Sequence, residues 1–115
     1  MKYIILIYDD EEAWAAASEN ERSDVVAEHG RLFEDLQKKN AFLAGEPLEP
    51  SATATTVRTK DGKSTVSPGP PSKGSQQLGG FYLIEAPDLE TVVAYAKTLS
   101  GTVEIRPVAN FPTTS

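Results

Sequence analysis

Residues 69–84 read Gly-Pro-Pro-Ser-Lys-Gly-Ser-Gln-Gln-Leu-Gly-Gly-Phe-Tyr-Leu-Ile, a loop rich in proline, glycine and serine that runs into an aromatic and aliphatic strand. Proline lacks the N–H that a strand ladder needs and glycine is costly to order, so the first part is neither a helix nor a central strand. The second part predicts a core strand over residues 80–85. A loop tied in this way to a core strand often carries function.

The composition limits the classes of protein to which the chain can belong. A length of 115 residues suits one domain with a single core. The net charge is −6, and the absence of a basic patch argues against nucleic acid as a partner. The absence of cysteine excludes disulfides, thiol catalysis and thiolate metal sites. The apolar start is too short for a signal peptide and no segment could cross a bilayer, so we expect a cytoplasmic protein without a membrane partner.

Residues 2–8 predict a strand that is apolar on both faces. One face carries Tyr3, Ile5 and Ile7, and the other carries Ile4, Leu6 and Tyr8. Such a strand belongs in a sheet that is covered on both sides. Because a chain this short has few helices, we expect a second copy of the chain to supply the other cover.

Local signals predict three helices. A short helix covers residues 11–17, and a long one follows, capped by Ser18 or Asn20 and ending near Lys38–Lys39. A third begins after its cap, Asp88, and is expected to end at Gly101.

The remaining segments predict strands, and their order predicts the fold. These strands cover residues 41–44, 53–60, 63–67, 80–85 and 102–107, with Asp61-Gly62 as the turn of a hairpin. The order strand, helix, strand, hairpin, strand, helix, strand predicts an α+β, ferredoxin-like sandwich with an inserted β-hairpin. We assign residues 1–108 to a single domain and residues 109–115 to a C-terminal tail.

Several segments carry a resemblance to a known family. They are Gly-Glu-Pro-Leu at 45–48, Ala-Thr-Ala-Thr-Thr-Val-Arg at 52–58, Gln-Leu-Gly-Gly-Phe-Tyr-Leu-Ile at 77–84 and Val-Glu-Ile-Arg-Pro-Val at 103–108. On these residues the chain resembles the YCII-related (DGPF-domain) proteins of bacteria over nearly its whole length. The resemblance implies a dimeric α/β barrel, a homodimer of ferredoxin-like protomers whose sheets face each other and leave a cleft between sheet and loop.

The chain departs from the family pattern at the motif that names it. Asp-Gly-Pro-Phe falls on Pro68-Gly69-Pro70-Pro71, so Pro68 replaces the acid and Pro71 the aromatic residue. The resemblance implies a catalytic histidine–aspartate pair in some relatives, among them a dehydrochlorinase-type enzyme. Proline has no side-chain acceptor, so we expect any activity that needs the aspartate of this motif to be lost.

His29 is the only histidine and the candidate catalytic residue. It lies at helical spacing from Val25, Leu32 and Leu36, which predicts that it faces the sheet. An imidazole in this position can serve as a general base near neutral pH. The alternative is a structural role, with the ring bonded to a backbone carbonyl or an acid.

Three residues are candidates for ligand binding. Glu46 lies between Gly45 and Pro47, and Arg106 alternates away from Val103 and Ile105 toward the uncovered face of the sheet. With Tyr82 and His29, they are expected to surround a cleft between that face and the loop at 68–77, and to bind an anionic or polar ligand. Alternatively, Glu46 and Arg106 form a structural ion pair, and Tyr82 belongs to the core.

The four acids at residues 9–12 raise the question of a divalent metal site. Consecutive acids on a turn do not easily converge on one ion, which favours a solvated helix N-terminus. We therefore predict neither a metal nor a cofactor.

Three functions remain open. The leading hypothesis is binding of a small molecule or a protein partner, with weak or no catalysis. The second is a small-molecule lyase or dehydrochlorinase-like enzyme with His29 as its base. The third is a structural accessory protein linked to a sigma factor or a biosynthetic cluster. Pro68 and Pro71 favour the first and third, and His29 keeps the second open.

Overall fold

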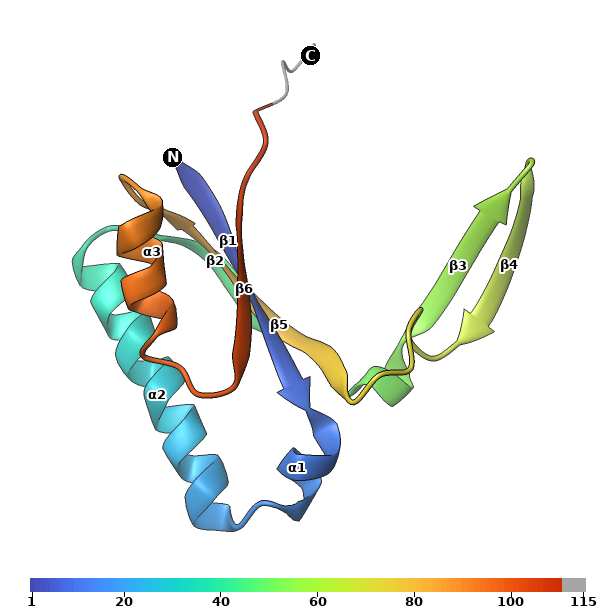
Figure 1. The fold of residues 1–115 in the computed structure, drawn as a ribbon, viewed down its shortest axis with the longest axis horizontal. Coiled ribbons are helices and arrows are strands. Elements are labelled where there is room, and N and C mark those ends of the chain that lie inside the picture. The colour runs from blue at the N-terminus through green and yellow to red at the C-terminus, as the bar shows by residue number, and fades with distance from the viewer. Residues whose placement is uncertain (111–115) are drawn as a thin grey trace.

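The computed structural model describes residues 1–110, in which helices cover one face of a four-stranded antiparallel sheet (Figure 1). The strands lie in the order β2-β5-β1-β6, with β1 at Lys2–Asp10, β2 at Phe42–Pro47, β5 at Gln76–Glu85 and β6 at Thr102–Pro107. Apart from the inserted hairpin, the chain follows the β-α-β-β-α-β order of the ferredoxin-like fold, so the predicted α+β class is confirmed. The sheet keeps two free edges, β2 and β6, so the protomer does not close a barrel.

The three predicted helices are present, and two of them begin at predicted caps. The three helices are α1 (Glu11–Ala16), α2 (Glu19–Lys38) and α3 (Leu89–Ala96). Ser18 and Glu21 form the capping box that begins α2, and Asp88 accepts a hydrogen bond from the backbone N–H of Thr91 at the start of α3. The prediction that α3 ends at Gly101 is wrong, because the chain after Ala96 tightens into turns in which backbone N–H groups bond three residues back. Gly101 instead lies in the turn into β6 with φ +89°.

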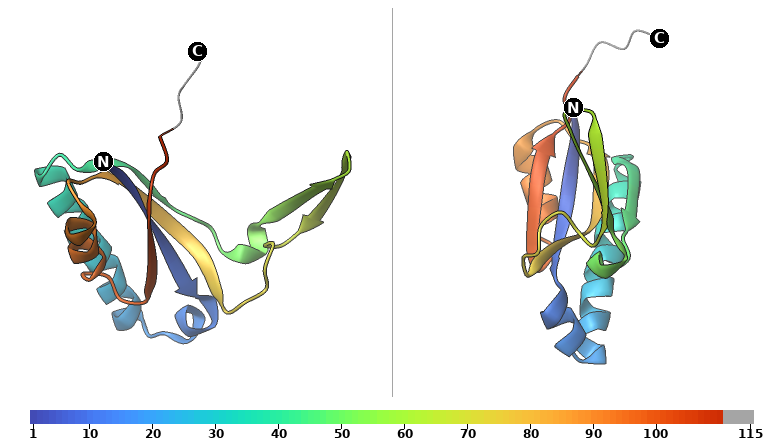
Figure 2. Two further views of the ribbon diagram at one scale, coloured as in Figure 1. Left: turned by 45° about the horizontal axis from the view of Figure 1, so that its top comes forward. Right: turned by 90° about the vertical axis from the view of Figure 1, so that its right-hand side faces the viewer.

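The inserted hairpin projects from the sheet as an arm, residues 55–68 (Figures 1 and 2). It consists of β3 (Thr55–Lys60) and β4 (Lys63–Pro68), which follow a short 3-10 turn at Ser51–Thr53. Asp61 and Gly62 have φ of 53° and 76°, as a two-residue hairpin turn requires, which confirms the predicted turn. Paired valines at 57 and 66 stay exposed on the arm, since the chain itself covers neither.

Strand β5 begins at Gln76, four residues before the predicted start at residue 80. It extends this far because its partner β1 runs on to Asp10, which pairs with Gln76, while Asp9 pairs with Gln77. The loop rich in proline and glycine therefore shrinks to residues 69–75.

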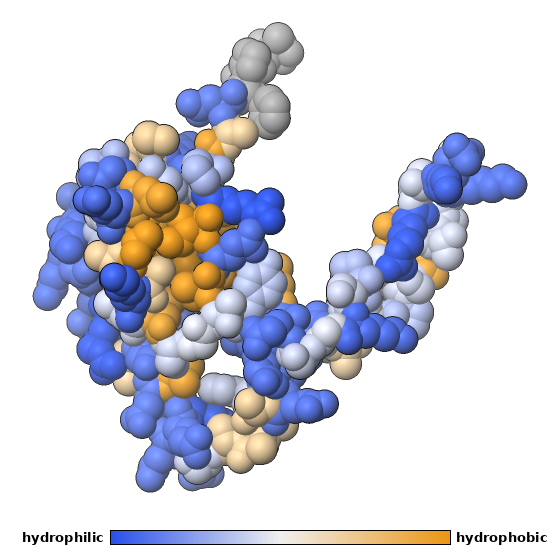
Figure 3. Space-filling view, viewed as in Figure 1, coloured by the Kyte–Doolittle hydropathy of each residue, from blue (hydrophilic) through white to orange (hydrophobic). Residues whose placement is uncertain are grey.

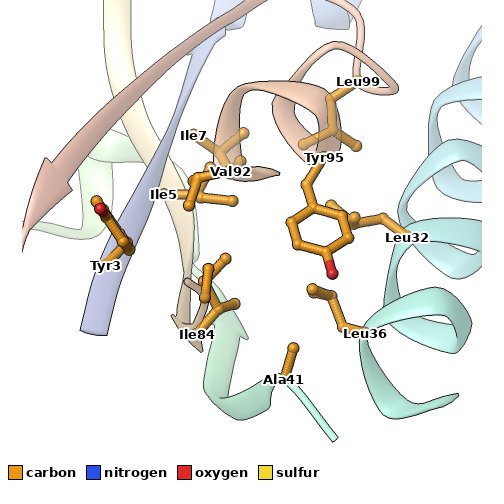
Figure 4. Packing of buried hydrophobic residues seen from close by; sticks show 11 residues of the cluster. Tyr3, Ile5, Ile7, Leu32, Leu36, Ala41, Ile84, Val92, Tyr95 and Leu99 are labelled. Carbon is orange, nitrogen blue, oxygen red and sulfur yellow. The ribbon is translucent and has the colours of Figure 1, made fainter. Parts of the chain in front are cut away.

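The core lies between the sheet and the helices (Figure 4). Alternate residues of β1 and β5 point toward α2 and α3, and the buried cluster contains Tyr3, Ile5, Ile7, Leu32, Leu36, Ile84, Val92, Tyr95 and Leu99. Ile4 pairs with Leu83 and Leu6 with Phe81 on the opposite side of the sheet, which no helix of residues 1–110 covers (Figure 2). We call these four residues the open face.

Among residues 1–110, every helix is too short or too polar to span a membrane.

Leu36→Ala tests the packing of α2 on the sheet. The Leu36 side chain is 0% exposed, so its truncation should lower the free energy of unfolding by about 2–5 kcal/mol. Val26→Ala is the matched control on the same helix, since Val26 is 65% exposed and should change stability by no more than about 0.5 kcal/mol. Urea denaturation of both variants measures the difference, and equal losses would contradict this packing.

Candidate functional site

A cavity of about 650 Å³ lies between the first half of α2 and the edge of the sheet formed by β2 and β5. This volume lies within the range of small-molecule sites. Most of its lining is apolar and includes Ile7, Val25, Phe33, Phe42 and Leu48. The polar groups inside it are few, namely Asp9, His29 and Tyr82, and Glu46 lies at its rim.

The cavity exists because α2 packs closely on the sheet only near its C-terminal end. Leu32 and Leu36 are its only buried residues. One helical turn earlier His29 is half-buried, and Val25 and Val26 line the cavity instead of filling it. The first half of α2 therefore forms a wall of the cavity.

His29 and Tyr82 join the helix to the sheet inside this cavity. His29 Nδ1 lies 2.7 Å from Tyr82 Oη, and the two rings are stacked at 15°. Burial lowers the pKa of His29 below its ordinary 6.5, although the nearby carboxylates of Glu28 and Asp9 oppose the shift. Burial also raises the pKa of Tyr82. The site thus holds a neutral imidazole and a protonated phenol at neutral pH.

Asp9 is a third polar group of the site, and sequence reasoning missed it. A bulge in the pairing of β5 with β1 leaves Gly79 without a partner, and a Cβ at Gly79 would clash with Asp9 Oδ2. A side chain at this position would force the Asp9 carboxylate to move, so glycine leaves room for the carboxylate to lie across β5. Asp9 as a whole is exposed, but the partial burial of its carboxylate raises its pKa, and the attraction of His29 opposes that shift.

The acids at residues 9–12 diverge. Asp10 caps α1 by accepting from the backbone N–H of Ala13, and Glu11 accepts from the Ser51 backbone N–H and hydroxyl. Asp9 alone lines the cavity beside His29. Strand alternation already places Asp9 on the same face as Ile5 and Ile7. This signal was overlooked because a run of four acids suggests exposure to solvent.

The structure brings two of the four predicted site residues into contact. His29 and Tyr82 lie in the cavity and Glu46 lies at its rim, paired with Phe81 of the open face, whereas Arg106 pairs with Glu104 on the uncovered side of the sheet. Tyr8 donates a 2.9 Å hydrogen bond to the same Glu104. Arg106 cannot meet His29, because a residue on the inner stripe of α2 faces the covered side of the sheet.

The predicted position of the cleft, between the uncovered face and the loop at 68–77, is wrong for this cavity. None of its lining residues comes from that loop. The segment Pro68–Pro71 instead forms the base of the arm, where Arg58 donates to the Pro71 carbonyl and the Gly69 N–H donates to the Ala54 carbonyl. The prolines at 68 and 71 therefore remove no group from the His29 cavity.

Trp14, the single tryptophan of the chain, also lines the cavity. It lies on α1, none of whose residues is buried. Arg22 holds the helix by donating to the carbonyls of Trp14 and Ala15 at 3.0 and 2.9 Å, with its guanidinium 5.7 Å from the indole centre. A wall held by exposed polar contacts can move at lower cost than one built from core residues.

The titration of His29 tests the electrostatics of the site. NMR should give a pKa below 6.5 for its ring, and Asp9→Asn should lower that pKa further by removing a charge that favours imidazolium. Below pH 6.5 the unfolded chain binds more protons at this residue than the folded one, so the His29 contribution makes stability fall as pH decreases through this window. A pKa at or above 6.5, or no change in Asp9→Asn, would contradict the arrangement.

Two comparisons relate this chain to known proteins. The model of the YCII-related domain family matches residues 1–112. A protein of Rhizobium meliloti (strain 1021), described as "Uncharacterized protein R00369", is 30% identical to this chain over 115 residues, which span 95% of this chain and 93% of that protein. Both matches include the strands and the helix that carry Asp9, His29 and Tyr82. The chain therefore belongs to the YCII-related domain family.

Proposed function

We propose that this protein binds a small, mainly apolar molecule in the cavity beside α2. The observation that carries the proposal is the His29–Tyr82 pair, a 2.7 Å contact between two half-buried rings in a cavity of about 650 Å³. Small-molecule sites combine apolar walls with a few polar groups in this way. The concave form of the site supports a small molecule over a protein partner.

Proton transfer by His29 is the second candidate function. In the tautomer that carries its proton on Nδ1, the ring donates to Tyr82 Oη, and Nε2 keeps a lone pair that can accept a proton. The lowered pKa keeps the ring neutral, as a general base must be, and Asp9 favours the imidazolium that would form. Because Pro68 and Pro71 lie outside the cavity, their presence does not argue against this chemistry.

His29→Gln separates the two candidates. Under the catalytic function the variant keeps most of its affinity for a small molecule and loses its conversion. Under the binding function the variant loses affinity for the small molecule, and the wild type converts no ligand. The role of a structural accessory protein and the cytoplasmic location stay predictions, since no contact within residues 1–110 bears on them.

Filling the cavity tests the proposed binding. N-phenyl-1-naphthylamine, a neutral apolar dye, should bind one molecule per protomer with a rise in its emission. Gly30 lines the cavity and has nothing within 4 Å of an added Cβ, so Gly30→Leu should fill space without a backbone clash and weaken dye binding about 10-fold or more. Ala27→Leu, on an exposed position of α2, is the control. Equal dye affinity in both variants would contradict the proposed site.

We also propose that two copies of the chain associate through the open face. Ile4, Leu6, Phe81 and Leu83 present apolar side chains there, and a sheet face of this kind gains stability when it is covered. The arm supports the same proposal, because an isolated two-stranded hairpin is at best marginally stable in water. Figure 3 shows a wide gap between the arm and the rest of the protomer, and this gap is where the proposed second copy would lie.

Leu6→Glu tests this association. A charge in the middle of the open face would have to be buried without a partner in the dimer, so the variant should dissociate to monomers. Leu89→Glu is the control, because Leu89 is 52% exposed on α3, away from the open face. Light scattering with size-exclusion chromatography should give a dimer for the wild type and the control. A monomeric wild type would contradict the proposal.

A further inference from the structure

Within residues 1–110, the one carboxylate on the covered side of the sheet in this cavity belongs to Asp9. Glu46 lies at the rim, paired with Phe81 of the open face, and within the described part of the chain the lining contains neither lysine nor arginine. His29 does not balance the Asp9 charge, because burial lowers the pKa of the imidazole. The potential inside the cavity is therefore negative at neutral pH.

Two arginines near this end of the fold are engaged elsewhere. Arg22 donates to two carbonyls of α1 and lies over the Trp14 ring, and Arg106 pairs with Glu104 on the other side of the sheet. An anionic ligand would thus meet the Asp9 carboxylate and no cation among the described lining residues. Such a ligand would lose its hydration without gaining an ion pair, which is unfavourable.

The Asp9 carboxylate has free capacity to bind a donor. Within residues 1–110 no side chain or backbone N–H donates a hydrogen bond to it, whereas Asp10 and Glu11 next to it are both used as acceptors. It also lies against Gly79, where there is no side chain to shield it. An N–H donor that reached Asp9 would form a charge-assisted hydrogen bond, which is about twice as strong as a neutral one.

Aromatic rings add a second attraction for a cation. Trp14, Phe33, Phe42 and Tyr82 all line the cavity, and Phe33 and Phe42 meet edge to face with centroids 4.9 Å apart. The faces of such rings attract ammonium groups, and the same rings accept a flat apolar body. The walls and the carboxylate therefore favour the same kind of molecule.

We propose that the ligand of this cavity is an aromatic amine, with its ring against the apolar wall and its ammonium group bound by Asp9. This inference rests on the proposed binding function and narrows it to one class of molecule. The sequence predicts an anionic or polar ligand, and the anionic alternative depended on Arg106, which lies on the other side of the sheet.

Three probes that share a phenyl ring and differ in the charge of their polar group test the proposal. They are 2-phenylethylamine, 2-phenylethanol and phenylacetate, which at pH 7.5 are cationic, neutral and anionic. Titrations of the full chain are followed by amide NMR, in which the one tryptophan gives a single indole N–H signal that reports on the cavity wall. We expect the amine to bind about 10-fold or more tightly than the alcohol, and the carboxylate to bind most weakly.

Asp9→Asn identifies the residue responsible. It should reduce the affinity for the amine to that for the alcohol and leave the alcohol unchanged, whereas Asp24→Asn, a control at an exposed acid on α2, should change neither. Phenylacetate binding as tightly as the amine would overturn the proposal, as would unchanged amine binding in Asp9→Asn. If no probe shifts the indole signal, the proposed binding function itself fails. If all three bind equally, that function stands and the preference for an amine is wrong.

Discussion

The packing of α2 against the sheet changes along the helix, and the candidate site depends on that change. Leu36 and Leu32 are sealed against the core, which fixes the C-terminal half of the helix. One turn earlier His29 reaches the sheet through a single hydrogen bond to Tyr82. One turn before His29, Val25 lines the cavity and lies outside the buried core cluster. A helix held firmly at one end can border a cavity at the other without loss of the fold, because the buried cluster supplies most of the stabilisation.

The sheet contributes to the site through an irregularity. The extra residue of the bulge in β5 is Gly79, which has no side chain, so the carboxylate of Asp9 on β1 can lie across the strand there. Bulges often occur beside functional sites, where they redirect a side chain. The same region connects to α1, whose Trp14 forms part of the wall. The three polar groups of the site therefore come from β1, α2 and β5, which are adjacent only in the folded chain.

The fold could be predicted from the sequence because its signals are local. The capping box of Ser18 and the Asp61-Gly62 turn each need only a few neighbouring residues, and the 3.6-residue period placed His29 on the inner face. The site was predicted in part. Arg106 was wrongly grouped with His29, because alternation gives the two faces of a strand without saying which one the helices cover. Asp9 was missed because a run of acids indicates solvent exposure, although strand alternation places Asp9 on the inner face and glycine at the bulge leaves room for its carboxylate.

The state of the His29 ring tests the central claim of this account most directly. Nitrogen-15 NMR at pH 7.5 distinguishes imidazolium, the two neutral tautomers and their rapid exchange. We predict a neutral ring whose Nδ1 signal reports the hydrogen bond to Tyr82 and changes in Tyr82→Phe. An imidazolium ring in the wild type, or an Nδ1 signal that stays the same in Tyr82→Phe, would contradict the account.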